Sequence, residues 1–191
     1  MKKLLLIMLL AISYSGFAQT SNKGKLDIYV GYGLLTAQDI IQISGTMWSG
    51  VLLPGAFDKV DIDGFGAVFA GIDYYLNDRA SLGLQVNYAA YDATYKLSSG
   101  GDFKIKNTFI TPMVHAKANW VNLKYFQLYS AIAAGASFIT GVDDNNKKGN
   151  STSFAFQVSP LGLRVGNTFS IFAEGGFGYQ GIVSAGVALK L

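Results

Sequence analysis

Cysteine is absent from this chain of 191 residues, so neither a disulfide nor thiol chemistry contributes to its structure or function. Histidine occurs once, at His115, which excludes a metal site built on two histidines. Glutamate also occurs once, as Glu174 in the apolar and glycine-rich segment SIFAEGGFGYQG (170–181). An ionised carboxylate in such a segment needs a partner or water, so Glu174 requires an explanation.

A membrane-spanning helix is missing too, because no run of 18 or more apolar residues follows the N-terminal segment. Yet 50% of the residues are hydrophobic, and the chain contains 23 glycines, 11 tyrosines and 13 phenylalanines. An apolar chain without a spanning helix is either a secreted β-protein with a large core or a membrane β-barrel. The many glycine and aromatic residues favour the barrel.

Residues 1–18 are expected to form a signal peptide. Lys2 and Lys3 precede an apolar stretch at 4–12, and small residues follow before Gln19. Residues 19–191 then form a single domain. Removing Lys2 and Lys3 leaves 13 basic and 12 acidic residues, a balance that gives no support for a nucleic-acid partner.

The mature chain alternates between apolar and polar residues with a period of two, which is typical of half-buried β-strands. Leu82, Leu84 and Val86 share one face of a segment whose other face carries Gln85 and Asn87. Eight such strands are predicted, with the third lying between a turn at 77–79 and a break at 98–102. The other seven are 26–34, 62–76, 103–120, 125–140, 151–165, 168–179 and 182–191.

The first six predicted connections alternate in length, and the seventh, near Gln180, is short and breaks the alternation. The short ones are 77–79, 121–124 and 166–167, whereas 35–61, 98–102 and 143–150 are longer or more polar. An outer-membrane barrel with both termini in the periplasm has short periplasmic turns and longer external loops. We therefore predict an all-β fold: an eight-stranded antiparallel up-and-down transmembrane β-barrel with a closed polar lumen.

Two further patterns agree with a barrel. Aromatic residues gather near the predicted strand ends, as membrane-interface girdles do. They are Tyr74, Tyr75, Trp120, Tyr125, Phe126 and Phe169 at one rim, and Tyr88, Tyr91, Phe177 and Tyr179 at the other. The alternation slips near Pro112 and Pro160, and a β-bulge is expected at each because proline cannot donate to a ladder.

The segments FAQ (17–19), LGLQVNY (82–88), FAEGGFGYQG (172–181) and VSAGVALKL (183–191) resemble the small outer-membrane β-barrels of Gram-negative bacteria, the OmpA/OmpX-like and PorT-like families. The likeness is one of pattern and covers the whole mature chain. It implies a place in the outer membrane, contact with its lipid, and passage through the barrel-assembly machinery. Family members usually end on an aromatic residue, whereas this chain ends on Leu191.

Charged and amide side chains fall on the predicted inner face of this barrel. The expected polar network of the lumen contains Asp27, Asp73, Glu174, Lys117, Arg164, Lys190, Gln85 and Asn87, with Gln127 and His115 beside it. An eight-stranded barrel is wide enough only for its own side chains, so three acids and three bases predict a neutral plug. Arg164 or Lys190 is the expected partner of Glu174. A proton or ion path through the same residues is the alternative.

Enzymatic activity is not expected, nor is a cofactor or a metal. Some small barrels modify lipid A, and His115 could act as a base, but no serine lies in a nucleophile-elbow pattern. A soluble, lipocalin-like ligand binder is the other alternative. The first long connection is unusually apolar and predicts an interaction surface for an unidentified surface or envelope protein. Its apolar residues are Ile40, Ile41, Met47, Trp48 and Leu52.

Overall fold

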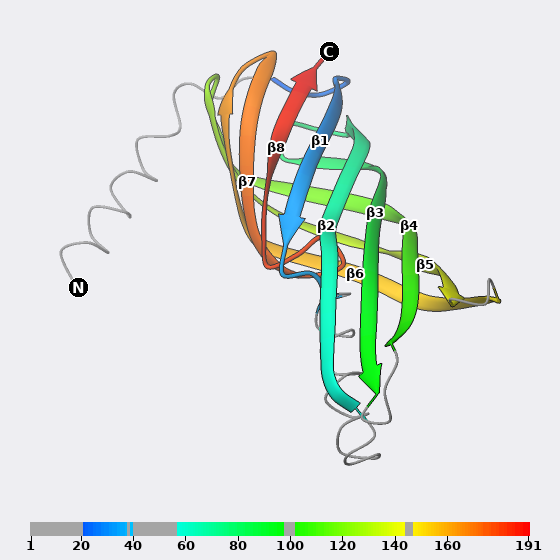
Figure 1. Cartoon of the computed structure of the whole chain (residues 1–191). Helices are drawn as coiled ribbons and strands as arrows, with labels where there is room; N and C mark the ends of the chain where they lie inside the picture. The colour runs from blue at the N-terminus through cyan, green and yellow to red at the C-terminus, as the bar shows by residue number, and fades with distance from the viewer. Residues whose placement is uncertain (1–20, 38, 40–56, 98–101, 144–146) are drawn as a thin grey trace.

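The computed structural model describes residues 21–37, 39, 57–97, 102–143 and 147–191. They form one closed antiparallel barrel in which every strand pairs with its neighbours in the sequence and β1 pairs with β8 (Figure 1). The strands are β1 (Leu26–Leu34), β2 (Phe57–Tyr75), β3 (Ala80–Leu97), β4 (Asp102–Asn122), β5 (Phe126–Asp143), β6 (Lys148–Gly166), β7 (Phe169–Gly178) and β8 (Val183–Lys190). The predicted eight-stranded barrel is confirmed.

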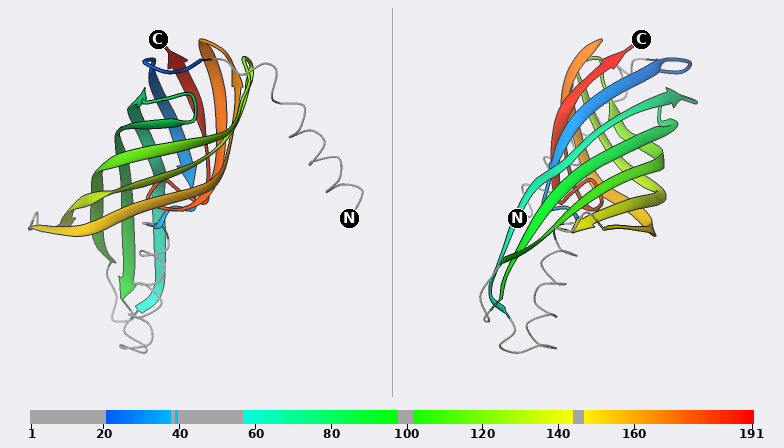
Figure 2. Two further views of the ribbon diagram at one scale, coloured as in Figure 1. Left: turned by 180° about the vertical axis from the view of Figure 1, so that it is seen from behind. Right: turned by 45° about the vertical axis from the view of Figure 1, so that its right-hand side comes forward.

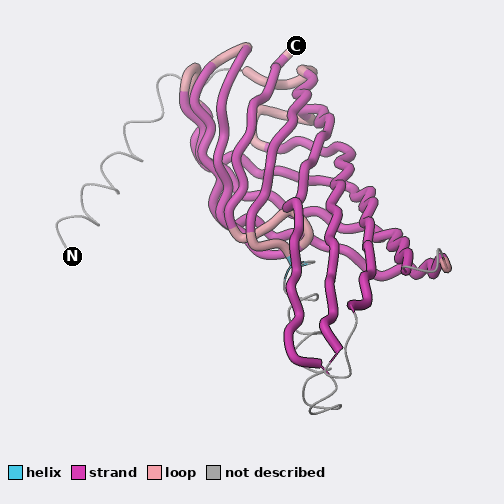
Figure 3. Tube along the Cα trace, in the orientation of Figure 1, coloured by secondary structure: helices cyan, strands magenta, loops and turns pink. Residues whose placement is uncertain are grey.

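Strands β2 to β6 have 18 to 21 residues each, whereas β1, β7 and β8 have 8 to 10. The five long strands extend beyond the short ones, away from the end at which the C-terminus lies (Figures 1 and 2). The short turns 76–79, 123–125 and 167–168 all lie at the C-terminal end of the barrel. Figure 3 shows that strands make up most of the described chain.

Two predicted connections are shorter than expected. β2 begins at Phe57 and not at Ile62, and β5 and β6 extend into the segment 143–150. The sequences involved, FDKVD (57–61) and KGNS (148–151), carry little apolar character on either face. Strands that project beyond the apolar part of a barrel need no apolar face, so their period-two signal is lost.

Side chains alternate between the inside and the outside of the barrel except near the bulges, where Pro160 and Leu161 are both exposed. In β1 the burial alternates along the whole strand, with Ile28 43% exposed and Tyr29 6% exposed. Of the ten aromatic residues predicted to form girdles, Tyr75, Tyr91 and Tyr179 point inward and are buried, which corrects that assignment. Tyr74 and Tyr75 are adjacent, so the pleat sends one of them outward and the other inward.

Only one of the two bulges expected at proline is present. The ladders on both sides of β6 shift register near Pro160. At Pro112 the ladder to β5 skips Thr111 and Pro112 and resumes in the same register, so no residue is inserted. A further register shift leaves Trp120 as an extra residue of β4 against β5, and in the shift near Pro160 the single residue Ser130 on β5 lies opposite Pro160 and Leu161.

Hydrogen bonds through Ser130 on β5 join the bulge on β4 to the bulge on β6. The Trp120 indole N–H donates to Ser130 Oγ at 2.8 Å, and the Ser130 hydroxyl donates to the carbonyl oxygen of Pro160. Each bulge leaves backbone groups without a ladder partner. The Ser130 hydroxyl supplies a partner for one of them, the carbonyl oxygen of Pro160.

Candidate functional site

The polar residues predicted for the lumen all lie on the inner face of the barrel. Each is at most 8% exposed, and the list comprises Asp27, Asp73, Glu174, Lys117, Arg164, Lys190, Gln85 and Asn87, together with Gln127 and His115. The outer face is apolar, with Leu84 61% exposed and Ile171 59% exposed. The molecule is therefore inverted relative to a water-soluble barrel with an apolar interior.

The centre of the lumen holds an ion-pair cluster. Asp27 on β1 and Asp73 on β2 are direct cross-strand partners, so two carboxylates face each other. Lys117 Nζ lies 3.6 Å from Asp27 Oδ2 and 3.3 Å from Asp73 Oδ2. Arg164 on β6 forms a second ion pair with Asp27 from the opposite side. The two cations offset the repulsion between the carboxylates, which would otherwise oppose burying both.

His115 is part of this cluster. Its Nδ1 lies 2.9 Å from Asp73 Oδ1 and 3.2 Å from the Tyr29 hydroxyl. Asp73 on β2 and His115 on β4 are not on adjacent strands, because β3 runs between them with Gly83 opposite both. Because Gly83 has no side chain, the Asp73 carboxylate and the His115 ring can contact each other across β3.

Glu174 is bound by neutral donors, which corrects the predicted ion pair. The Tyr129 hydroxyl donates to Glu174 Oε1 at 2.7 Å, and the Gln180 side-chain amide donates to Oε2 at 2.9 Å. Within the described residues no ion pair joins Glu174 to Arg164 or Lys190. Arg164 instead pairs with Asp27, because inward side chains from opposite walls meet at the centre of a narrow barrel.

Tyr129 reaches Glu174 across an inward-facing glycine in the same way that Asp73 reaches His115. Tyr129 on β5 and Glu174 on β7 are both register partners of Gly162 on β6. A Cβ atom at Gly162 would collide with the Tyr129 ring. Tyr29 lies across Gly71 in the same manner and donates to Gln85 Oε1 at 3.1 Å. Three such gaps thus allow next-nearest strands to exchange hydrogen bonds.

At the end of the lumen near the long loops, the connection between β7 and β8 enters the barrel. Gln180 lies in this connection and is 1% exposed. Its side-chain nitrogen donates to Glu174 and to Ser184 Oγ, and its side-chain oxygen accepts a hydrogen bond from Gln85 at 2.9 Å. The connection can enter the mouth because Gly33 has no side chain where the Gln180 carbonyl passes.

At the opposite end, the segment before β1 places a side chain inside the barrel. The Asn22 side chain is 1% exposed and lies between Asn122 and Lys190. Asn22 Nδ2 donates to Asn122 Oδ1 at 2.8 Å, and Lys190 Nζ donates to Asn22 Oδ1 at 3.1 Å. Outside the strands, the Asp78 carboxylate accepts hydrogen bonds from the backbone of Asn22 and Lys23. These backbone donors, that of Asn22 first, hold the pKa of Asp78 below its usual value.

Little space remains among the side chains that fill the lumen. A cavity of about 10 Å³ lies within the central cluster, about enough for one water molecule. Its lining residues are Asp27, Tyr29, His115, Lys117, Tyr129, Arg164, Phe172, Glu174 and Ala188. Two aromatic rings cover the ammonium group in it, since Lys117 Nζ lies 5.4 Å from the Tyr29 ring centre and 4.9 Å from that of Tyr129.

The chemistry open to this arrangement is limited. Among the described residues, no group of three or more His, Asp or Glu side chains is placed to hold a metal ion. His115 is 3% exposed, and the hydrogen bonds given for its ring lead to a carboxylate and a phenol rather than to a serine. In the same described segments, no helix is sufficiently long and apolar to span a bilayer.

The predicted interaction loop lies outside the described residues. This applies to Ile40, Ile41, Met47, Trp48 and Leu52, and also to the signal peptide at 1–18. Both assignments remain predictions.

Comparisons with known proteins give distant structural likenesses only. No family model and no curated protein matches the chain. It is similar to the N-terminal β-barrel domain of OprF from Pseudomonas aeruginosa, with a TM-score of 0.48, 13% identity, and coverage of 88% of this chain and 98% of that one. It is also similar to Ail, the attachment invasion locus protein of Yersinia pestis, with a TM-score of 0.42, 13% identity, and coverage of 88% and 95%.

The predicted polar network leaves out several residues that help to fill the lumen, among them Asn22, Tyr29, Tyr129 and Gln180. Alternation places Tyr29 and Tyr129 on the inward faces that carry Asp27 and Gln127, as the structure confirms. Asn22 and Gln180 lie outside the strands, where no periodicity indicates the direction of a side chain.

Proposed function

We propose that this protein is an integral β-barrel of a Gram-negative outer membrane, with a closed lumen and a structural or surface-interaction role that involves no enzymatic step. The observation that carries the proposal is the inverted distribution of side chains. Ionised and amide groups are buried inside the barrel, and leucine, isoleucine, valine and phenylalanine cover its outside. Such an exterior is favourable in lipid and costly in water.

The dimensions of the apolar exterior support this location. On β4 the outward residues from Ile110 to Trp120 span roughly 34 Å at 3.4 Å per residue. With a tilt of about 40°, this corresponds to a height of roughly 26 Å, close to the apolar band of outer-membrane barrels. Trp120, Tyr125 and Phe169 are exposed near the end with the short turns, where an interfacial aromatic girdle would lie.

The layers of side chains in the lumen favour a closed barrel over a pore. Gln180 occupies one end, the Asp27 cluster the centre, and Asn22 the other end. Removing a partner from a buried charge pair is costly, so the layers oppose opening of a water-filled path. The role is therefore assigned to surfaces outside the lumen, such as the long ends of β2 to β6 and the loops that connect them. An envelope or surface protein is the expected partner, and the barrel-assembly machinery inserts the chain.

The alternative of a lipid A-modifying enzyme is less favoured because His115 lies inside the barrel rather than at the outer leaflet. In cells that produce the protein, His115→Ala is expected to leave the lipid acyl pattern unchanged. The soluble, lipocalin-like alternative requires apolar side chains around a ligand cavity, whereas the central cavity has mostly polar and charged lining residues.

Membrane fractionation combined with heat-modifiable migration on gels tests the proposal directly. The mature protein is expected in the detergent-extracted outer-membrane fraction, with unboiled and boiled samples migrating differently. Recovery of folded protein in the aqueous phase without detergent would refute the membrane assignment. A matched variant, Leu84→Arg, places a charge on the lipid-facing side and is expected to destabilise insertion by roughly 2–4 kcal/mol if Leu84 lies near the bilayer midplane.

A further inference from the structure

Three lysines occupy the outer face of the long strands beyond the apolar band. Lys104 and Lys106 lie two residues apart on β4 and point outward, as their exposure shows. In the ladders, Lys106 is opposite Val142 on β5, and Val142 is opposite Lys148 on β6. Lys106 and Lys148 are thus two strands apart, roughly 10 Å between backbones at the usual spacing.

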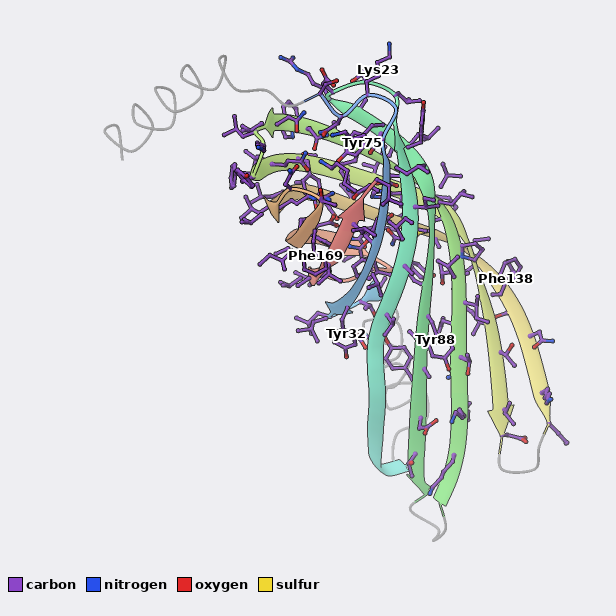
Figure 4. All side chains as sticks on the ribbon, turned by 90° about the horizontal axis from the view of Figure 1, so that it is seen from above. Lys23, Tyr32, Tyr75, Tyr88, Phe138 and Phe169 are labelled. Carbon is purple, nitrogen blue, oxygen red and sulfur yellow. The ribbon has the colours of Figure 1, made fainter. Side chains whose placement is uncertain are left out.

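The distance from this lysine cluster to the apolar band fits a lipid headgroup. The last apolar row below the cluster contains Tyr88, Ile110 and Phe138, which are cross-strand partners and 46 to 51% exposed (Figure 4 labels Tyr88 and Phe138). Lys106 lies four residues beyond Ile110, or roughly 14 Å along the strand. Lysine side chains can bend back toward an interface while their stems cover apolar surface.

An apolar groove lies on the same strands, just inside the band. It has a volume of about 240 Å³, and its lining includes Leu84, Val86, Pro112, Val114 and Ala134. Two features account for the groove. Ala134, the cross-strand partner of Val114, has a short side chain, and the ladder skips the position of Pro112.

We propose that the outer face of β3 to β6 is a binding site for an anionic, phosphate-bearing lipid of the outer leaflet. One acyl chain occupies the groove at Pro112 and Ala134, and the phosphate lies at Lys104, Lys106 and Lys148. Charge complementarity above the groove selects this occupant over an uncharged apolar partner. Asp92 is the partner of Lys106 on β3, so the phosphate lies toward β5 and β6. This inference rests on the proposed membrane location.

A tryptophan reporter at the groove tests the site. In a Trp48→Phe/Trp120→Phe background, Ile110→Trp places the sole indole between the groove and the lysines. The protein is folded into phosphatidylcholine vesicles containing a small fraction of phosphatidic acid or phosphatidylcholine with brominated chains. Quenching by brominated phosphatidic acid is expected to exceed quenching by brominated phosphatidylcholine, with a selectivity of roughly tenfold.

The selectivity is expected to disappear in Lys104→Gln/Lys106→Gln/Lys148→Gln and to persist in the matched control Lys25→Gln/Lys124→Gln, which changes lysines at the other end. Ala134→Phe fills the groove and is expected to reduce quenching by both lipids.

Three results would overturn the inference: equal quenching by the two lipids, equal loss in the control, or suppression by inorganic phosphate alone, which would indicate a site for a soluble anion. Binding of a protein that masks the reporter in cell envelopes but not in vesicles would assign the face to a protein partner instead. If the reporter protein inserts but shows no selectivity, only this inference fails. If it stays in the aqueous phase, the membrane location fails as well.

Discussion

Inward-facing glycines in this barrel allow long side chains on the two flanking strands to contact each other across the strand between them. Gly83 separates Asp73 from His115, and Gly162 separates Tyr129 from Glu174. In a barrel filled by its own side chains, an inward glycine is therefore part of the packing and not a gap in it.

The Gly162 arrangement predicts that Gly162→Ala destabilises the protein, because the added methyl group displaces the Tyr129 ring. A loss of about 1–3 kcal/mol is expected from overpacking. The measurement is the free energy of unfolding in urea, with the protein folded into vesicles. Gly175→Ala is the matched control, since a Cβ there meets no atom within 4 Å. Equal effects of the two substitutions would contradict the proposed role of Gly162.

The ion pair between Arg164 and Asp27 gives a second prediction. Arg164→Met leaves the buried Asp27 carboxylate with Lys117 at 3.6 Å as its remaining ion-pair partner among the described residues. We expect a loss of roughly 3–5 kcal/mol, as for other broken buried pairs. The double variant Asp27→Asn/Arg164→Met is expected to recover part of that loss, and the same unfolding measurement compares them. If the double variant is as unstable as the sum of the single changes, the two residues are not coupled.

At the scale of elements, the bulges on β4 and β6 are linked by one serine of the strand between them. Trp120 and Pro160 lie in these bulges, and Ser130 lies on β5. Ser130→Ala removes the two hydrogen bonds that join them, at a cost of roughly 1–3 kcal/mol. In a Trp48→Phe background, the fluorescence of Trp120 is expected to shift with the loss of its acceptor. Ser151→Ala, at an exposed position, is the control and is expected to change neither quantity.

The hydrogen bonds between the N-terminal segment and Asp78 in the β2–β3 turn are predicted to depend on pH. The pKa of Asp78 is lowered by the backbone N–H groups of Asn22 and Lys23. A lowered pKa means that the stabilisation is complete above the ordinary carboxyl value of about 3.9 and is lost as the pH falls through the folded-state value. Hydrogen exchange at Asn22 and Lys23, corrected for intrinsic rates, is expected to accelerate in that acidic range.

Asp78→Asn serves as the control for the pH dependence of these hydrogen bonds. Its exchange rates are expected to be independent of pH in the same range after the same correction. A pH dependence that persists in Asp78→Asn would assign the effect to another group.

For the whole molecule, the proposed closure of the lumen predicts that the protein does not conduct ions. Planar bilayers containing the wild-type protein are expected to show no steady single-channel current. Removing one side chain from each layer, in Asn22→Ala/Arg164→Ala/Gln180→Ala, is expected to produce measurable conductance, because water can then enter from both ends. A conducting wild type would support an ion path through the lumen, and a silent triple variant would show that other side chains close it.

The sequence by itself determined the barrel and the direction of its polar residues. Alternation with a period of two sends every second residue inward. The inward placement of Asp27, Asp73 and Glu174 therefore followed from this alternation alone. Strand ends such as Phe57 were missed, because a strand that projects into water needs no apolar face.

Only the tertiary structure decided which inward side chains meet. Partners in a closed barrel depend on the register of several ladders at once and on contacts across the lumen, and neither is encoded in a local pattern. Glu174 therefore binds Tyr129 and Gln180 rather than Arg164, which reaches across to Asp27. Gln180 itself lies in a connection, where the fold of the chain and not its periodicity turns the side chain into the barrel.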